Sequence, residues 1–255
     1  MRWLSLLLLL LTVPGRAQAP ATPACADAES CLTEGLRLAE GLNASADANR
    51  AASMLRLGCG KGSGLACAHA EILQAAYGEP GASRAVSAAD AERARQRLET
   101  DCASGIAQSC FLLGVAVENG LGVAADMAVS LRLYEQACGG NVARACYRQG
   151  QLLDAGPAAW RDPVQADELY RQACKGNEPR ACFDLAKKLA PAQGSVSDSV
   201  AQLYERGCSG DYLPSCTALA KLHLDGRLSK SDPAEAKRLL DRACKGGEPD
   251  ACQLR

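Results

Sequence analysis

Six cysteine pairs with one constant spacing constrain this chain more than any other feature. The two cysteines of each pair are eight residues apart: Cys59 and Cys67, Cys102 and Cys110, Cys138 and Cys146, Cys174 and Cys182, Cys208 and Cys216, and Cys244 and Cys252. The first cysteines of successive pairs follow one another after 43, 36, 36, 34 and 36 residues. A unit of this length that returns along a chain predicts a protein built from stacked repeats.

The cysteines predict disulfides. The chain contains 14 of them, and Cys25 and Cys31 supply a seventh pair. Zinc sites usually combine closely spaced cysteines with histidines, whereas His69 and His223 are isolated in the sequence. Redox enzymes of the thioredoxin kind use C-x-x-C, and the spacing here is C-x7-C. We therefore expect a disulfide frame with no metal site, no cofactor and no catalytic residue.

The first residues have the pattern of a secretory signal peptide. A positive start, Met1-Arg2, precedes a short apolar run and then small residues at Ala17 and Ala19. We assign residues 1–19 to this segment and favour cleavage after Ala17, since cleavage after Ala19 would leave Pro20 at the new terminus. The run is shorter than the roughly 20 residues of a membrane span. We expect residues 20–255 to be periplasmic or secreted, an oxidising location that suits disulfides, without membrane insertion.

The charge excludes one class of partner. Lys and Arg total 28 against 29 Asp and Glu, which gives a net charge of −1. Such a chain has no global basic field to attract nucleic acid. We expect no nucleic-acid binding.

Each unit reads as two helices. The segments that end at the first cysteine, such as Leu133–Cys138 and Leu169–Cys174, have helix-forming composition with apolar residues three to five apart. A glycine-rich turn follows, as at Gly139-Gly140-Asn141, where we expect glycine to adopt the left-handed conformation that ends a helix. The second cysteine opens the next helix. Aspartates then mark the start of its partner helix and are expected to cap it: Asp126, Asp162, Asp198 and Asp232.

The sequence therefore predicts an all-α fold, an α/α solenoid of about six helix pairs with a short C-terminal cap. In this arrangement each cysteine pair links the end of one helix to the start of the next across a short turn, within disulfide reach. The approximate units are 25–59, 60–102, 103–138, 139–174, 175–208 and 209–244, and the cap is 245–255.

These motifs resemble a known family. The pattern L-Y-x-x-A-C, a glycine turn, A-C-x-x-L-G and D-x-x-x-A-x-x-L-Y resembles the Sel-like repeat, a relative of the tetratricopeptide repeat. The cysteine spacing and the apparent signal peptide are most similar to the secreted cysteine-rich proteins of Helicobacter. The resemblance implies a right-handed superhelix whose concave face binds other proteins. Two features depart from the pattern, an insertion around Gly78 to Asp90 and Gln149 in place of leucine.

The same resemblance implies an alternative function, a β-lactam- or cell-wall-binding protein with weak β-lactamase-like activity. A serine β-lactamase needs a serine with lysine three residues on, together with S-D-N and K-T-G elements. The sequence has none of these elements, and Ser229-Lys230-Ser231-Asp232 has the letters in the wrong order. We therefore prefer a monomeric scaffold that binds a protein or peptide.

The candidate binding residues follow the second cysteines. Phe111, Tyr147 and Phe183 are 36 residues apart, and on a tetratricopeptide-like frame they would lie on the concave face as anchors for a bound segment. One turn later on that face we expect Val115, Gln151, Lys187 and Lys221. The alternative is that the three aromatic residues pack beside the disulfides as core. Three tyrosines that precede the first cysteines are expected to be core: Tyr134, Tyr170 and Tyr204.

Overall fold

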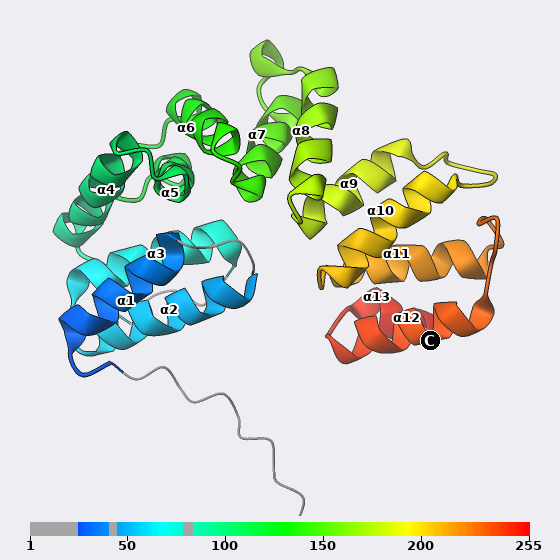
Figure 1. Ribbon diagram of the computed structural model, residues 1–255, viewed down its shortest axis with the longest axis horizontal. Helices are drawn as coiled ribbons and strands as arrows, with labels where there is room; N and C mark the ends of the chain where they lie inside the picture. The colour runs from blue at the N-terminus through cyan, green and yellow to red at the C-terminus, as the bar shows by residue number, and fades with distance from the viewer. Residues whose placement is uncertain (1–24, 41–44, 79–83) are drawn as a thin grey trace, which may run out of the picture.

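The computed structural model describes residues 25–40, 45–78 and 84–255 and shows only helices and connections there (Figure 1). The predicted signal peptide lies outside these ranges. The α-helices are α1 Ala28–Glu40, α2 Ser45–Gly60, α3 Gly64–Tyr77, α4 Ala88–Ala103, α5 Ala107–Glu118, α6 Met127–Gly139, α7 Ala143–Ala155, α8 Pro163–Lys175, α9 Pro179–Leu189, α10 Asp198–Ser209, α11 Leu213–Leu224, α12 Pro233–Lys245 and α13 Pro249–Leu254. A 3₁₀ turn, Ala158–Trp160, precedes α8.

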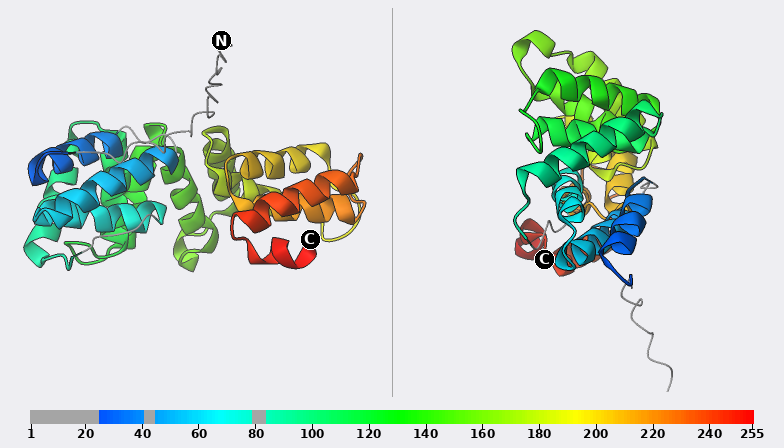
Figure 2. Two further views of the ribbon diagram at one scale, coloured as in Figure 1. Left: turned by 90° about the horizontal axis from the view of Figure 1, so that it is seen from below. Right: turned by 90° about the vertical axis from the view of Figure 1, so that its left-hand side faces the viewer.

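The helices form antiparallel pairs that stack into an arch (Figure 1). We call the first helix of each pair the A helix (α1, α3, α5, α7, α9, α11) and the second the B helix (α2, α4, α6, α8, α10, α12). Helix α13 has the place of a seventh A helix. The first and last pairs lie at opposite ends of the molecule (Figure 2). The predicted α/α solenoid is confirmed.

The described residues contain seven disulfides, and six of them fasten the connections between units. Six of them join cysteines that are eight residues apart: Cys59 to Cys67, Cys102 to Cys110, Cys138 to Cys146, Cys174 to Cys182, Cys208 to Cys216, and Cys244 to Cys252. Each of the six links the end of a B helix to the first turn of the next A helix, with Cα atoms 4.6–4.7 Å apart. The seventh, between Cys25 and Cys31, ties the segment before α1 to that helix.

The disulfides are mostly enclosed by the stack. The second cysteine of the pair is buried in the first five of these turns, at Cys67, Cys110, Cys146, Cys182 and Cys216. Cys252 differs, because it is exposed in the terminal helix α13. The described chain contains no free cysteine. Each short loop closure removes entropy from the unfolded chain, worth about 2.5 kcal/mol in the chain-entropy account.

The six disulfide turns share one backbone geometry. The third residue after the first cysteine has a positive φ in every turn: Gly62, Gly105, Asn141, Asn177, Asp211 and Gly247. Its N–H donates to the carbonyl of that cysteine, and the next N–H donates to the carbonyl of the residue before the cysteine, all at 2.9–3.1 Å. These paired bonds are the Schellman ending of a helix. The prediction that glycine adopts the left-handed conformation is therefore wrong for three turns, where asparagine or aspartate does so.

The glycine before the left-handed residue has a different role. Gly140 has a φ of −83°, which any residue tolerates, but a Cβ there would lie 2.3 Å from the Cβ of Ala107 at the start of the preceding A helix. Likewise, a Cβ at Gly176 would lie 2.7 Å from the Cβ of Ala143. Glycine is needed in the last four turns because each of them packs directly on the start of the preceding A helix, whereas Lys61 and Ser104 have this place in the first two turns.

Within a pair, tyrosines of the B helix pack against glycines of the A helix. A Cβ at Gly114 would lie 2.6 Å from the Tyr134 ring, and one at Gly150 would lie 2.9 Å from the Tyr170 ring. Tyr134, Tyr170 and Tyr204 are all buried, as predicted. These buried rings and small residues fill the space between the helices of three pairs.

Aspartates cap three of the four expected B helices. Asp126, Asp162 and Asp232 each accept a hydrogen bond from a backbone N–H in the first turn, at 2.8–2.9 Å. Asp198 departs from the expectation, because Ser197 precedes α10 as its cap residue and Asp198 is the first helical residue. The Asp198 carboxylate instead accepts a hydrogen bond from the Ser229 hydroxyl, at 2.7 Å, in the following unit.

Two adjacent glycines allow a direct test of this turn packing. We expect Gly140→Ala to lower the free energy of unfolding by about 1–3 kcal/mol, because the added methyl group overpacks against Ala107. Gly139→Ala should cause no loss, since a Cβ there meets no atom within 4 Å. Chemical denaturation of the two oxidised variants measures the difference. Equal stabilities would contradict this account of the turns.

His69 is a buried histidine in α3 without a hydrogen-bond partner for its Nε2 atom. Burial, with a smaller contribution from the charge of Arg97, lowers its pKa from 6.5 to about 4. The folded protein therefore holds a neutral imidazole at a pH where the unfolded chain would protonate it.

This burial predicts acid sensitivity. Folding lowers the pKa of this histidine, so its contribution to the stability of the folded state is complete above the pKa of the unfolded chain. That contribution is lost as the pH falls toward the pKa of the folded state. Between pH 6.5 and 4 we expect a loss of about 3 kcal/mol from this residue. The loss should be absent in His69→Leu, so the unfolding free energies of wild type and variant, measured by urea titration, should diverge as pH falls. Parallel curves would contradict the prediction.

Candidate functional site

The A helices contact one another along one side of the stack, which we call the inner side. Helices α1, α3 and α5 contact one another across units, whereas B helices make no comparable contact with each other in the described ranges. Figure 1 shows α5 inside α4 and α6. The inner side is therefore where the predicted binding residues have to be assessed.

The first half of the inner side is closed by the chain itself. Phe111 and Val115 of α5 have 0% exposure. The Phe111 ring lies between those of Tyr77 and Tyr134, with centroid distances of 5.8 and 5.9 Å. The expectation that Phe111 and Val115 lie on an accessible concave face is therefore wrong, because both are buried, and Tyr77 of the preceding unit and Tyr134 of the same unit enclose the Phe111 ring.

Arg144 of α7 completes this closure. Its guanidinium lies 4.5 Å from the centre of the Tyr77 ring and donates to the carbonyl of Ala76, at the end of α3. The same guanidinium forms a buried ion pair with Glu178, with Nε and Oε2 2.7 Å apart. Arg148 donates to the Ala75 carbonyl at 3.2 Å. Two arginines of the fourth unit thus hold the end of the second unit across α5.

A hydrogen-bonded chain begins the second half of the inner side. Gln151 donates to the hydroxyl of Tyr147, which in turn donates to the carboxylate of Asp184 on the next A helix; both bonds are 2.8 Å long. Gln151 and Asp184 are half-buried, whereas the Tyr147 side chain is buried. Burial raises the pKa of the Asp184 carboxyl above its ordinary value, although the Tyr147 hydrogen bond opposes the shift.

The accessible part of the inner side centres on α9 and α11. Phe183 and Tyr212 are both half-buried, and their rings meet edge to face with centroids 5.2 Å apart. Lys187 and Lys221 are exposed at equivalent positions of the two helices, although Lys221 Nζ lies 3.9 Å from an oxygen of Asp250. The structure thus brings three of the predicted residues near one face and adds Tyr212, which the sequence analysis missed. Its position directly before an A helix was the available signal.

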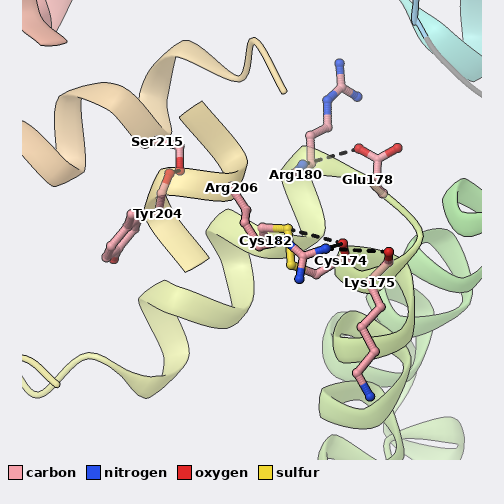
Figure 3. The surroundings of a disulfide bond; sticks show 8 residues. All are labelled: Cys174, Lys175, Glu178, Arg180, Cys182, Tyr204, Arg206 and Ser215. Carbon is pink, nitrogen blue, oxygen red and sulfur yellow. Dashed lines mark hydrogen bonds between the residues drawn. A yellow bond between two sulfur atoms is a disulfide. The ribbon is translucent and has the colours of Figure 1, made fainter. Parts of the chain in front are cut away.

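The outer edge of the turns is polar. Arg206 of α10 donates to the carbonyls of Cys174 and Lys175, beside the Cys174–Cys182 disulfide (Figure 3). Arg242 has the same position one unit later and approaches the sulfur of Cys208 at 3.8 Å. Arg206 satisfies carbonyls at the end of α8, where cations are favoured, whereas Arg242 donates to the Asp211 carboxylate. Their role here is to join neighbouring units.

Two chemical features are absent from the described part of the chain. Within residues 25–40, 45–78 and 84–255, no three metal-ligating side chains of the usual kinds come together. In the same residues no helix is long and apolar enough to cross a membrane.

The Arg144–Glu178 pair can be tested as a unit. The side chains are only 11% and 4% exposed. Breaking a buried pair from one side leaves an uncompensated charge, so Arg144→Met and Glu178→Gln should each cost about 3 kcal/mol of unfolding free energy. The double variant should lose clearly less unfolding free energy than the two single variants lose together. Urea denaturation of the four proteins measures the coupling, and additive costs would show that the two side chains act independently.

The Sel1 repeat family matches the chain at residues 107–142, 140–178 and 213–248. No curated protein is a significant match. Among solved structures, a Sel1 repeat protein from Oxalobacter formigenes is 22% identical, with a TM-score of 0.56; the match covers 63% of this chain and 67% of that one.

A second solved structure is c5321, described as a protective antigen of uropathogenic Escherichia coli strains with an SLR fold. It is 18% identical, with a TM-score of 0.59, over 89% of this chain. The matched region spans about half of c5321, 47% of its length. Both neighbours share the stacked helix pairs, and the matched residues include one complete disulfide turn, that of Cys138 and Cys146. Three matched Sel1 repeats, solved neighbours with the SLR fold and seven disulfides thus fit a cysteine-rich SLR protein.

Proposed function

We propose that this chain is an exported scaffold that binds a protein or peptide through the inner side of α7, α9 and α11. Sel1 repeat folds commonly serve as protein-interaction scaffolds, which supports the general class of function. The observation that carries the proposal is the half-buried pair of rings, Phe183 and Tyr212, with exposed lysines on the same two helices. Aromatic side chains are enriched in interfaces, and tyrosine is among the residues that most often dominate the binding energy.

The proposed surface is smaller than the one expected from the repeat pattern. It includes Tyr147 through its hydroxyl, together with Gln151, Lys187 and Lys221, and excludes the buried part of α5. Rigid units hold this surface in place, because disulfides fasten the turns at the starts of α7, α9 and α11. A preformed surface loses little conformational entropy on binding.

The location is part of the proposal. Seven disulfides are typical of proteins that fold in an oxidising compartment. The signal-peptide pattern of residues 1–19 supports export of a chain that begins near residue 20. We further propose that the exported chain acts as a monomer. No observation in the described residues favours the β-lactam-directed alternative, and it is not part of the proposal.

Charge reversal on the inner side tests this proposal. The bait is the purified, oxidised mature chain, crosslinked to envelope and secreted extracts of the producing organism, with captured proteins identified by mass spectrometry. Lys187→Glu with Lys221→Glu should reduce recovery of a captured partner by about tenfold, equivalent to ~1.4 kcal/mol of binding free energy. Both lysines are exposed, so the variant should fold normally.

The control carries the same change of charge on B helices. Arg171→Glu with Lys237→Glu alters exposed residues of α8 and α12 and should leave capture unchanged. Circular dichroism of all three proteins checks that they fold alike. Equal capture by the two variants, or no partner enriched by wild type, would contradict an inner-side scaffold.

A further inference from the structure

The ion pair between Arg144 and Glu178 occupies a place in the repeat that returns one unit later. Two nitrogens of Arg144 donate to the two carboxylate oxygens of Glu178, at 2.7 and 3.4 Å. Arg144 lies two residues before the second cysteine of its turn, and Glu178 lies four residues before the second cysteine of the following turn. In the next unit the same two places hold Arg180 and Tyr212. This second step therefore has the arginine but no glutamate opposite it.

The guanidinium of Arg180 has no hydrogen-bond or ion-pair partner in the part of the chain that the structure describes. The backbone N–H of Arg180 donates to Glu178 Oε1 at 3.3 Å, but the side chain extends away from that carboxylate (Figure 3). Asp184, one turn along α9, instead accepts a hydrogen bond from the Tyr147 hydroxyl at 2.8 Å. Arg180 is half-buried, so its guanidinium is partly removed from water and still has N–H groups to donate.

Arg180 lies beside the aromatic pair of the proposed binding surface. Burial raises the pKa values of the Tyr147 and Tyr212 hydroxyls, and the positive charge of Arg180 opposes the shift at each of them. The guanidinium is therefore within electrostatic reach of both tyrosines. Phe183 is three residues from Arg180 on α9, a spacing that places two side chains on the same side of a helix. A segment that packs on the two rings therefore passes close to Arg180.

The charges around Arg180 are mixed and give no broad positive field. Lys187 is exposed on the same helix, whereas the negative charges of Asp184 and Glu248 add to the effect of burial on the pKa of Tyr212. Recognition of an anion at this place therefore depends on short-range hydrogen bonds. A planar guanidinium can donate two parallel N–H bonds to one carboxylate, a geometry that favours carboxylates over other groups.

From the unpaired guanidinium and the pair formed one unit earlier, we propose that the binding partner supplies the missing carboxylate, as a glutamate or aspartate side chain next to an aromatic residue. The aromatic residue packs on Phe183 and Tyr212. The carboxylate accepts two N–H groups of Arg180, as Glu178 does from Arg144. This inference rests on the proposed scaffold function and names the chemistry of the segment that binds there.

Short peptides test the chemistry. Acetyl-Phe-Glu-amide and acetyl-Glu-Phe-amide carry both features, and their glutamine analogues lack only the charge. Each peptide is titrated into the oxidised mature protein and followed by amide NMR. We expect the better glutamate peptide to bind about tenfold more tightly than its glutamine analogue, because charge-assisted hydrogen bonds are the stronger ones, with shifted signals around Arg180 and Tyr212. Equal affinities, or no binding at this place, would overturn the proposal.

A further probe separates the two sources of a carboxylate. Acetylphenylalanine has a terminal carboxylate and no acidic side chain. It should bind less tightly than the glutamate peptide. Tighter binding of acetylphenylalanine would assign the site to the C-terminus of a partner and overturn the proposed side chain.

Two variants at position 212 either rebuild the missing pair or leave it open. Tyr212→Glu places a carboxylate where Glu178 stands relative to Arg144, so it should pair with Arg180 and abolish the preference for glutamate. Tyr212→Gln also removes the ring but adds no charge, and it should keep the preference while all peptides bind more weakly. Arg180→Gln should abolish the preference, whereas Arg171→Gln on α8 should leave it unchanged. An equal preference in the two variants at position 212 would overturn the pairing.

Capture from extracts separates this inference from the scaffold function on which it rests. Arg180→Gln should reduce recovery of the wild-type partner by about tenfold. If recovery falls in the variant with Lys187→Glu and Lys221→Glu but not in Arg180→Gln, the role of Arg180 is wrong and the scaffold function stands. If wild type enriches no partner, the scaffold function is wrong, and the peptide titrations still decide whether Arg180 binds a carboxylate.

Discussion

Every unit of this molecule depends on the short, covalently closed turn between one helix pair and the next. The Schellman bonds end the B helix, the left-handed residue reverses the chain, and the disulfide fixes the start of the following A helix. Because the same turn is used six times, the direction of each new pair is set locally. The core can then consist largely of alanine and leucine with a few buried tyrosines, since little of the arrangement is left for large apolar side chains to specify.

The contacts between units come in two kinds. Neighbouring units meet through the glycine of one turn and the first residues of the preceding A helix, and Arg206 and Arg242 add bonds across the same boundary. Contacts that skip a unit are found on the inner side, where Arg144 reaches the end of α3. The first kind sets the spacing of the stack. The second kind changes what the inner side can offer to a partner, because Arg144 lies over the Tyr77 ring beside Phe111.

The cysteine period is sufficient to predict the helix pairs, the position of the turns and the class of fold, because each of these depends on residues within one unit. The turn chemistry is predicted less well. Glycine and asparagine adjoin in these turns, and only the packing of Gly140 on Ala107 shows that the glycine is there for its size. The capping residues are also predicted less well, because Asp198 lies one residue after the cap position, inside α10.

The inner side is predicted least well, for a physical reason. Phe111 and Phe183 occupy the same position of the repeat, yet one is buried and the other half-buried. The difference arises from Tyr77 and Arg144, which are far apart in sequence and meet only because of the curvature of the stack. A repeat alignment treats equivalent positions as equal and carries no information on such contacts. Tyr212 shows the converse, a residue outside the aligned aromatic position that the stack brings beside Phe183.

The small size of the disulfide loops also governs how the native pairing can be reached. In the six turns each cysteine lies eight residues from its partner and more than 20 from the nearest cysteine of another turn, so chain statistics alone favour the native bond. Every bond can form as soon as one B helix and the beginning of the next A helix are available. Oxidation can therefore proceed unit by unit from the first turn onward, in step with a chain that emerges from its N-terminus, without waiting for the C-terminal half and without a search among distant cysteines.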